Sequence, residues 1–139
     1  MRNRVGGIYI TEDKIVLIHR IKKESTIKEY YTIPGGGMEE NEDKITTFLR
    51  EMKEELGIDV TKYSGEPKYI LNSKEGNQYY YIIEDFDGVI GTGDGPEFND
   101  ETYKGGQYIV EYVLVKDLID GKINLLPEEI REQIINDLK

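Results

Sequence analysis

The sequence predicts a single domain of the α/β class, from its length and from the order of two kinds of segment. At 139 residues, the chain is long enough to bury a core without disulfides or structural metals. Runs rich in β-formers stand before and after a central segment with helical spacing, and a second helical segment ends the sequence. With no internal repeat or linker in the sequence, we expect residues 1–139 to form one domain.

The composition limits the classes of function. With 28 acidic and 18 basic side chains, the formal net charge is −10, which argues against a nucleic-acid backbone as the main partner. There is no Cys, so a disulfide framework, a zinc–thiolate site and a thiol nucleophile are excluded. No apolar run has the length of a membrane span or a signal peptide, so we expect a soluble, cytoplasmic protein. An acidic chain that binds a phosphate compound needs metal ions and local cations, such as Arg20 or Lys22.

Three strands are predicted before the central helix. Residues 5–10 and 14–21 are β-rich runs joined by a short polar segment, which favours a hairpin. Residues 29–33 form a third run, and Pro34 ends it. Arg20, in the second run, carries a planar guanidinium that suits a phosphate group.

The central segment has the spacing of an amphipathic helix. Its apolar residues recur at intervals of three and four and form one stripe: Ile45, Phe48, Leu49, Met52 and Leu56. Asp43 suits the N-cap position, and Gly57 suits the left-handed position after the last turn. The sequence therefore predicts a helix between these two residues.

Three carboxylates near the end of this helix call for a positive partner. Glu51, Glu54 and Glu55 are spaced i, i+3 and i+4, so they share one flank of the helix next to Arg50. The helix dipole disfavours anions in the last turns by roughly 0.3–1 kcal/mol each. Converging carboxylates form a hard oxygen site that suits magnesium or manganese. The alternative is a solvated acidic face, on which charges interact weakly in water.

The segment around this helix resembles the signature of the Nudix hydrolase family. That signature is Gly, five residues, Glu, seven residues, Arg-Glu, an apolar residue, any residue, Glu-Glu, any residue, Gly and an apolar residue. Every fixed position is matched: Gly36, Glu42, Arg50, Glu51, Met52, Glu54, Glu55, Gly57 and Ile58. Nine constrained positions at fixed spacing rarely match by chance. The resemblance implies an α/β/α sandwich with a mixed β-sheet, and a hydrolase as its activity.

The same resemblance implies the residues of the active site. Glu42 and Arg50 resemble the supporting pair of the family, in which the arginine orients the box carboxylates and does not touch the substrate. The cofactor would be Mg²⁺ or Mn²⁺. Its ligands would be the carbonyl of Gly36 and the carboxylates of Glu51, Glu54 and Glu55.

Three further candidates follow from positions that family members often use. Arg20 matches an arginine that faces the substrate phosphates, and Glu39 matches an acidic position in the loop before the helix. Members also recruit a Glu from the loop that corresponds to residues 87–106, as a metal ligand or general base. We choose Glu97 for this role, against the alternative of a solvated loop carboxylate.

Two strands joined by a turn are predicted after the helix, at residues 68–73 and 78–86. Three consecutive tyrosines begin the second of them and cannot all face the same side. Tyr79 and Tyr81 are our candidates for stacking a base in a substrate pocket, and the alternative is a role in the core.

The C-terminal part completes the domain. Residues 107–115 form another β-rich run, and Pro127 precedes a segment with acidic residues in its first turn, as helix starts often have. Ile130, Ile134 and Leu138 recur every four residues and form one face. We expect this helix to cover the sheet on the side opposite the central helix.

We therefore expect a metal-dependent hydrolase that cleaves the pyrophosphate bond of a nucleoside diphosphate linked to another group. The partner would be a small nucleotide, and the sequence leaves a homodimer open. The alternative is a Nudix-like module that senses a nucleotide without hydrolysing it, although all box carboxylates are present. Oxidised nucleotides, ordinary nucleoside triphosphates, nucleotide sugars and ADP-ribose all stay open as substrates.

Overall fold

The computed structural model describes residues 2–23, 27–93 and 106–139 of the chain. In these ranges the strands form two sheets. The first has the order β5-β1-β8-β6, with β7 also paired to β8. Its strands are β1 (Arg4–Ile8), β5 (Gly35–Gly37), β6 (Ile58–Tyr63), β7 (Tyr69–Leu71) and β8 (Gln78–Gly88). β1 and β8 run parallel while the other pairs are antiparallel, so this sheet is mixed, as predicted.

The second sheet has the order β10-β4-β3-β2, with β9 paired to the other edge of β3. It consists of β2 (Ile10–Thr11), β3 (Lys14–Lys23), β4 (Ile27–Thr32), β9 (Gln107–Leu114) and β10 (Leu125–Leu126). It is also mixed, because β10 and β4 are parallel.

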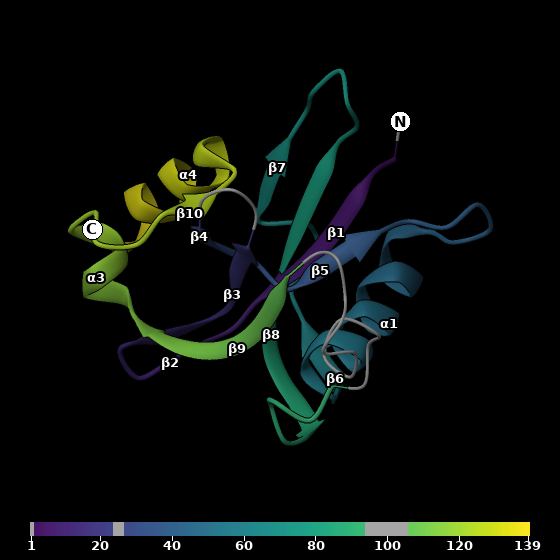
Figure 1. Cartoon of the computed structure of the whole chain (residues 1–139). Coiled ribbons are helices and arrows are strands. Elements are labelled where there is room, and N and C mark those ends of the chain that lie inside the picture. The colour runs from purple at the N-terminus through teal and green to yellow at the C-terminus, as the bar shows by residue number, and fades with distance from the viewer. Residues whose placement is uncertain (1, 24–26, 94–105) are drawn as a thin grey trace.

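In the described ranges, three helices accompany the two sheets: α1 (Lys44–Leu56), α3 (Val115–Ile119) and α4 (Glu128–Leu138). Figure 1 shows α1 on one side of the molecule and α3 with α4 on the other, as expected for the C-terminal helix. The fold is thus a layered α/β arrangement with mixed sheets between helices. No helix in the described ranges is long and apolar enough to cross a membrane.

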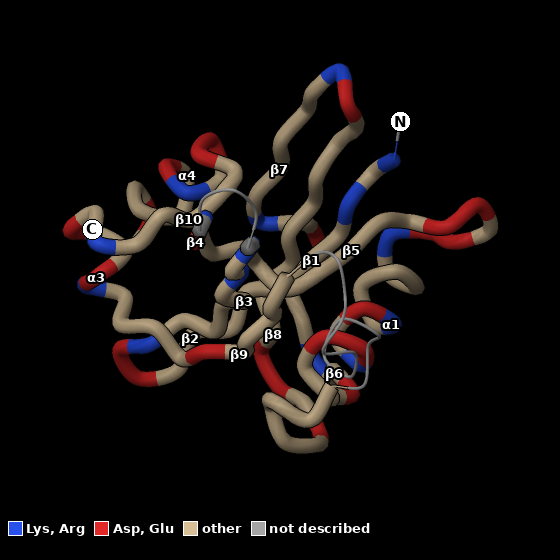
Figure 2. Tube along the Cα trace, in the orientation of Figure 1, with Lys and Arg blue, Asp and Glu red and all other residues tan. Residues whose placement is uncertain are grey.

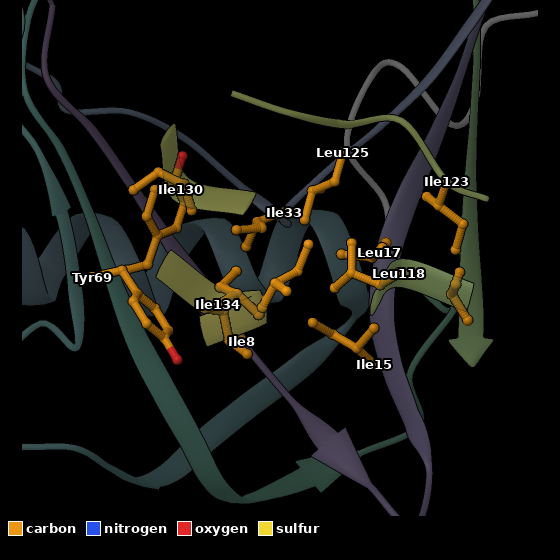
Figure 3. Packing of buried hydrophobic residues seen from close by; sticks show 13 residues of the cluster. Ile8, Ile15, Leu17, Ile33, Tyr69, Leu118, Ile123, Leu125, Ile130 and Ile134 are labelled. Carbon is orange, nitrogen blue, oxygen red and sulfur yellow. The ribbon is translucent and has the colours of Figure 1, made fainter. Parts of the chain in front are cut away.

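β3 separates two hydrophobic clusters because both of its faces are buried. Ile15 and Leu17 join the cluster under α3 and α4, which Figure 3 shows together with Leu125 and Ile134. Val16 and Ile18 point to the other face and join the cluster under α1. A strand buried on both faces needs a continuous apolar run, which this segment of the sequence has.

α1 begins and ends where its sequence signals predict. The Asp43 side chain accepts a hydrogen bond of 2.8 Å from the Thr46 N–H, as an N-cap residue does. Gly57 ends the helix at φ 77°, where a residue with a Cβ would be strained. The apolar stripe is correct except for Leu49, which is 37% exposed, whereas Phe48 is fully buried.

The predicted N-terminal hairpin of residues 5–10 and 14–21 is wrong in part. Only β2 pairs with β3, while β1 belongs to the other sheet and lies between β5 and β8. Gly6 permits this position, because a Cβ there would collide with the Pro34 carbonyl and the Tyr80 ring. The chain therefore changes sheets near Tyr9, and this change places the start of β1 beside the strand that precedes α1.

Candidate active site

One pocket lies where the two sheets meet beside α1. Its volume is about 620 Å³, and residues of both sheets and of α1 line it. The lining residues are Arg2, Arg4, Arg20, Thr32, Gly35, Gly36, Gly37, Arg50, Glu51, Glu54, Glu55 and Tyr108. Three carboxylates and four guanidinium groups thus share one cavity, which makes it a strongly polar site.

The three box carboxylates reach this pocket from one flank of α1. Glu51 and Glu55 are only 8% and 6% exposed, and Glu54 is partly exposed. The backbone of β5 passes directly over the first of them, because a Cβ on Gly36 would collide with the Glu51 carboxylate. A glycine is therefore required at this position of the box for steric reasons.

Burial makes Glu51 a weaker acid than an ordinary glutamate. Its pKa rises to about 7, first because burial disfavours the charged form and second because Glu54 is negatively charged. The positive charges of Arg50 and Arg4 oppose this rise. A carboxylate held in this way is stabilised in its charged form by any added cation.

Arg50 is at the centre of the carboxylate cluster. It donates two hydrogen bonds to Glu42, of 2.7 Å from Nε and 2.9 Å from Nη2. Nη1 lies 3.3 Å from an oxygen of Glu54 and 3.5 Å from one of Glu51, and Nη2 donates to the Gly37 carbonyl at 3.2 Å. The hydrogen bonds from Arg50 to Glu42 lower the pKa of Glu42 to about 2, so this carboxylate is ionised at neutral pH.

The donor set fits a divalent cation by its chemistry. Carboxylate oxygens from three side chains lie on one face of α1, beside the backbone of Gly36, and hard oxygen donors suit Mg²⁺ and Mn²⁺. In the described parts of the chain, no group of three or more Asp, Glu or His side chains has its oxygen or nitrogen atoms close enough together to hold a metal ion. The guanidinium of Arg50 lies between Glu51 and Glu54.

The structure brings some of the other predicted site residues together, but not all. Arg20 lines the pocket, with its Cζ 3.8 Å from the ring centroid of Tyr108. Glu39 is exposed and does not line the pocket, although its carboxylate lies 3.9 Å from Nη2 of Arg50. Glu97 lies outside the described residues, so its role stays a prediction.

Neither tyrosine that we chose as a base-stacking residue lines the pocket. Tyr81 is 3% exposed and packs against Phe48, with 5.1 Å between ring centroids. Tyr79 lies under the Lys44 ammonium, 4.4 Å from its ring centroid. Tyr81 therefore takes the core role that was its alternative, and the structure gives no support to a substrate role for either residue.

Sequence reasoning missed several residues that line the pocket, among them Arg2, Arg4 and Tyr108. Tyr108 lies opposite Arg20 in the pairing of β9 with β3, so it depends on a strand pairing that local patterns do not specify. For the two arginines, the sequence did contain a signal of a positively charged site. Two of the five arginines of an acidic chain stand at alternate positions near its start. Alternate positions on a strand face the same side.

Comparison with known proteins agrees with this geometry. A model of the NUDIX domain matches residues 1–132, which is nearly the whole chain. The chain therefore belongs to the Nudix family. Its class is that of a Nudix pyrophosphohydrolase, an enzyme that acts on phosphoric anhydrides such as nucleotide pyrophosphates.

Two curated relatives carry the name 8-oxo-dGTP diphosphatase. One, from Buchnera aphidicola subsp. Schizaphis graminum, is 25% identical over 116 residues, 84% of this chain and 79% of the relative. The other, from Proteus vulgaris, is 36% identical over 57 residues, 41% of this chain and 51% of the relative.

Solved structures show the same fold. A MutT structure from work on Aliivibrio salmonicida and Vibrio cholerae matches with a TM-score of 0.71 at 20% identity, covering 98% of both chains. A MutT Nudix hydrolase from Burkholderia pseudomallei matches with a TM-score of 0.66 at 17% identity, covering 96% of this chain and 95% of that one.

Proposed function

We propose that the chain uses Mg²⁺ or Mn²⁺ to hydrolyse the pyrophosphate bond of a nucleoside diphosphate linked to another group. The observation that carries this proposal is that three carboxylates on one flank of α1 line the same pocket as a guanidinium group of β3. These residues are Glu51, Glu54, Glu55 and Arg20. The relatives named 8-oxo-dGTP diphosphatase support nucleoside triphosphates, oxidised or not, as the first substrates to try.

The predicted site residues that line the pocket have separate roles in this proposal. The three carboxylates and the Gly36 carbonyl would hold the cation. When bound, a divalent cation polarises phosphate oxygens and lowers the pKa of the attacking water. Arg50, fixed by its two hydrogen bonds to Glu42, positions the carboxylates of α1. Arg20 would donate to a phosphate oxygen, since a guanidinium forms charge-assisted hydrogen bonds with phosphate.

The second candidate function is nucleotide sensing without hydrolysis. A sensor has no need of the full carboxylate set, whereas all three carboxylates are present in this pocket. The site therefore favours the enzyme.

The test is phosphate or pyrophosphate release from 8-oxo-dGTP, dGTP, a nucleotide sugar and ADP-ribose. Each substrate is incubated with magnesium, with manganese and with a chelator. We expect release from at least one of them, and we expect the chelator to abolish it. Tight binding of one compound without turnover of any would support the sensor instead.

A further inference from the structure

Thr47 is a fully buried polar residue of α1. Apart from tyrosines, the buried polar or charged side chains in the described ranges are Thr47, Glu51 and Glu55, and only the first is uncharged. The two glutamates line the pocket, whereas Thr47 does not. A buried hydroxyl group costs free energy unless it is hydrogen-bonded. The partner of this hydroxyl therefore indicates what the residue does.

The Thr47 hydroxyl lies near two acceptors but has only one hydrogen to donate. Oε1 of Glu42 is 2.9 Å away, and the carbonyl oxygen of Asp43 is 3.1 Å away. The carbonyl already accepts a hydrogen bond from the backbone N–H of Thr47. The carboxylate is the nearer acceptor and, because it is charged, the stronger one. We therefore assign the hydroxyl hydrogen to Glu42.

In the described part of the chain, four hydrogen bonds hold the Glu42 carboxylate. Arg50 donates two of them, the backbone N–H of Glu39 donates the third at 3.0 Å, and Thr47 donates the fourth. The donors differ in stiffness. The arginine side chain is long and Glu39 belongs to the loop, whereas a β-branched side chain on a helix has few rotamers. Thr47 is therefore the short, rigid donor that fixes Glu42 to α1.

Glu42 shares Arg50 with the box carboxylates. Nη1 of Arg50 lies 3.3 Å from an oxygen of Glu54 and 3.5 Å from one of Glu51. A guanidinium that moved closer to these oxygens would compete with a divalent cation for them, because both are positively charged. Glu42 holds the guanidinium by Nε and Nη2, on the side away from Nη1, and so limits this movement.

We propose that Thr47 is a positioning residue for the metal site. Its hydroxyl fixes Glu42, and Glu42 in turn keeps Arg50 from competing with the cation at Glu51 and Glu54. The inference rests on the proposed function, since it takes these two glutamates as metal ligands. Thr47 occupies none of the nine fixed positions of the Nudix signature, so the signature does not predict this role.

The alternative is that Thr47 only fills space in the helix, and two substitutions separate the two roles. Thr47→Val keeps the shape and loses the hydroxyl, whereas Thr47→Ser keeps the hydroxyl and loses a methyl group. A positioning role predicts that Thr47→Val is the more damaging change, and a packing role predicts that Thr47→Ser is. Thr46→Val is the matched control, because it makes the same chemical change at the neighbouring, exposed residue.

The first measurement is the affinity of each variant for Mn²⁺ alone, by calorimetry without a nucleotide. The loss of a hydrogen bond to a charged group corresponds to about 10-fold in an equilibrium constant. We expect the Kd for Mn²⁺ to rise on that scale in Thr47→Val and to stay near the wild-type value in Thr47→Ser and Thr46→Val. A larger rise in Thr47→Ser than in Thr47→Val would overturn the proposal.

The second measurement is the Mg²⁺ dependence of hydrolysis. Because the proposed effect is a competition, excess metal should overcome it. Thr47→Val should need more Mg²⁺ for half of its maximal rate and should approach the wild-type kcat at saturating Mg²⁺. A lower kcat at an unchanged Mg²⁺ requirement would overturn the proposal. If Thr47→Val does not fold, Thr47→Ala replaces it, because alanine favours the helix and differs from serine by the hydroxyl alone.

The Mn²⁺ titration separates this inference from the proposed function. If no nucleotide is hydrolysed, the proposed function fails, but weaker Mn²⁺ binding by Thr47→Val than by Thr47→Ser would still support the role of Thr47. Equal Mn²⁺ affinity in the wild type and Thr47→Val, or no Mn²⁺ binding by the wild type, would overturn the inference whatever the activity assay gives.

Discussion

Arg50 and Glu42 form a two-point ion pair, with Nε and Nη2 of the arginine 2.7 and 2.9 Å from the two carboxylate oxygens. Glu42 also accepts hydrogen bonds from the Thr47 hydroxyl and from the backbone N–H of Glu39. The loop before α1 is thereby fixed to the middle of the helix. In Figure 2 the loop between β5 and α1 is largely red, because acidic residues are concentrated in it. Arg50 holds one of these residues, Glu42, by two hydrogen bonds and lies 3.9 Å from a second, Glu39.

This pairing predicts a loss of stability in acid. Because the folded-state pKa of Glu42 is about 2 and its ordinary value is 4.5, its stabilising effect is complete above pH 4.5. The effect disappears as the pH falls from about 4.5 through about 2. Glu42→Gln should therefore be less stable than the wild type at pH 6, and the gap should narrow toward pH 2. Urea unfolding at a series of pH values measures this gap, and a gap that is independent of pH would contradict the assignment.

The contact between β5 and α1 predicts a strong effect of one methyl group. Gly36→Ala would push a Cβ into the Glu51 carboxylate, and a misplacement of about 1 Å at a catalytic group costs about 100-fold in rate. We expect kcat/KM to fall on that scale. Gly65→Ala is the matched control, because a Cβ there meets no atom within 4 Å. Similar kinetics in both variants would mean that the position of Glu51 is not critical.

The buried face of α1 gives a prediction about stability alone. Phe48 is fully buried against Tyr81 and Met52, so Phe48→Ala should lower the free energy of unfolding by about 3–5 kcal/mol. Its neighbour Leu49 is 37% exposed, and Leu49→Ala should cost much less. Chemical denaturation of both variants measures the difference. Equal losses would show that the apolar stripe does not define the core here.

Local signals in the sequence are sufficient for α1 and α4, but not for the short helix α3, and they are much less informative for the sheets. Asp43 and Gly57 fix the ends of α1 through contacts within a few residues, so the sequence alone predicts them. The pairing of β1 with β5 and β8 joins segments about 30 and 75 residues apart, and no local pattern encodes it. For that reason β1 was assigned to the wrong sheet.

The candidate site divides in the same way. The box carboxylates share one helix, so their spacing already predicts that they lie together. Arg4 and Tyr108 reach the pocket only because their strands pair with β5 and β3. Tyr81 was open to two interpretations, because the face of β8 that is buried depends on its register with β1.

The central claim is that the carboxylates of α1 carry a metal-dependent hydrolysis, and Glu54→Gln tests it most directly. This change removes one ligand charge and keeps the shape, and Glu129→Gln on α4 is the matched control at an exposed position. The measurement is the release of phosphate or pyrophosphate, with magnesium, from the best substrate of the panel. We predict that Glu54→Gln loses most of the activity at an unchanged melting temperature, while Glu129→Gln keeps it. Wild-type turnover by a folded Glu54→Gln variant would contradict the account.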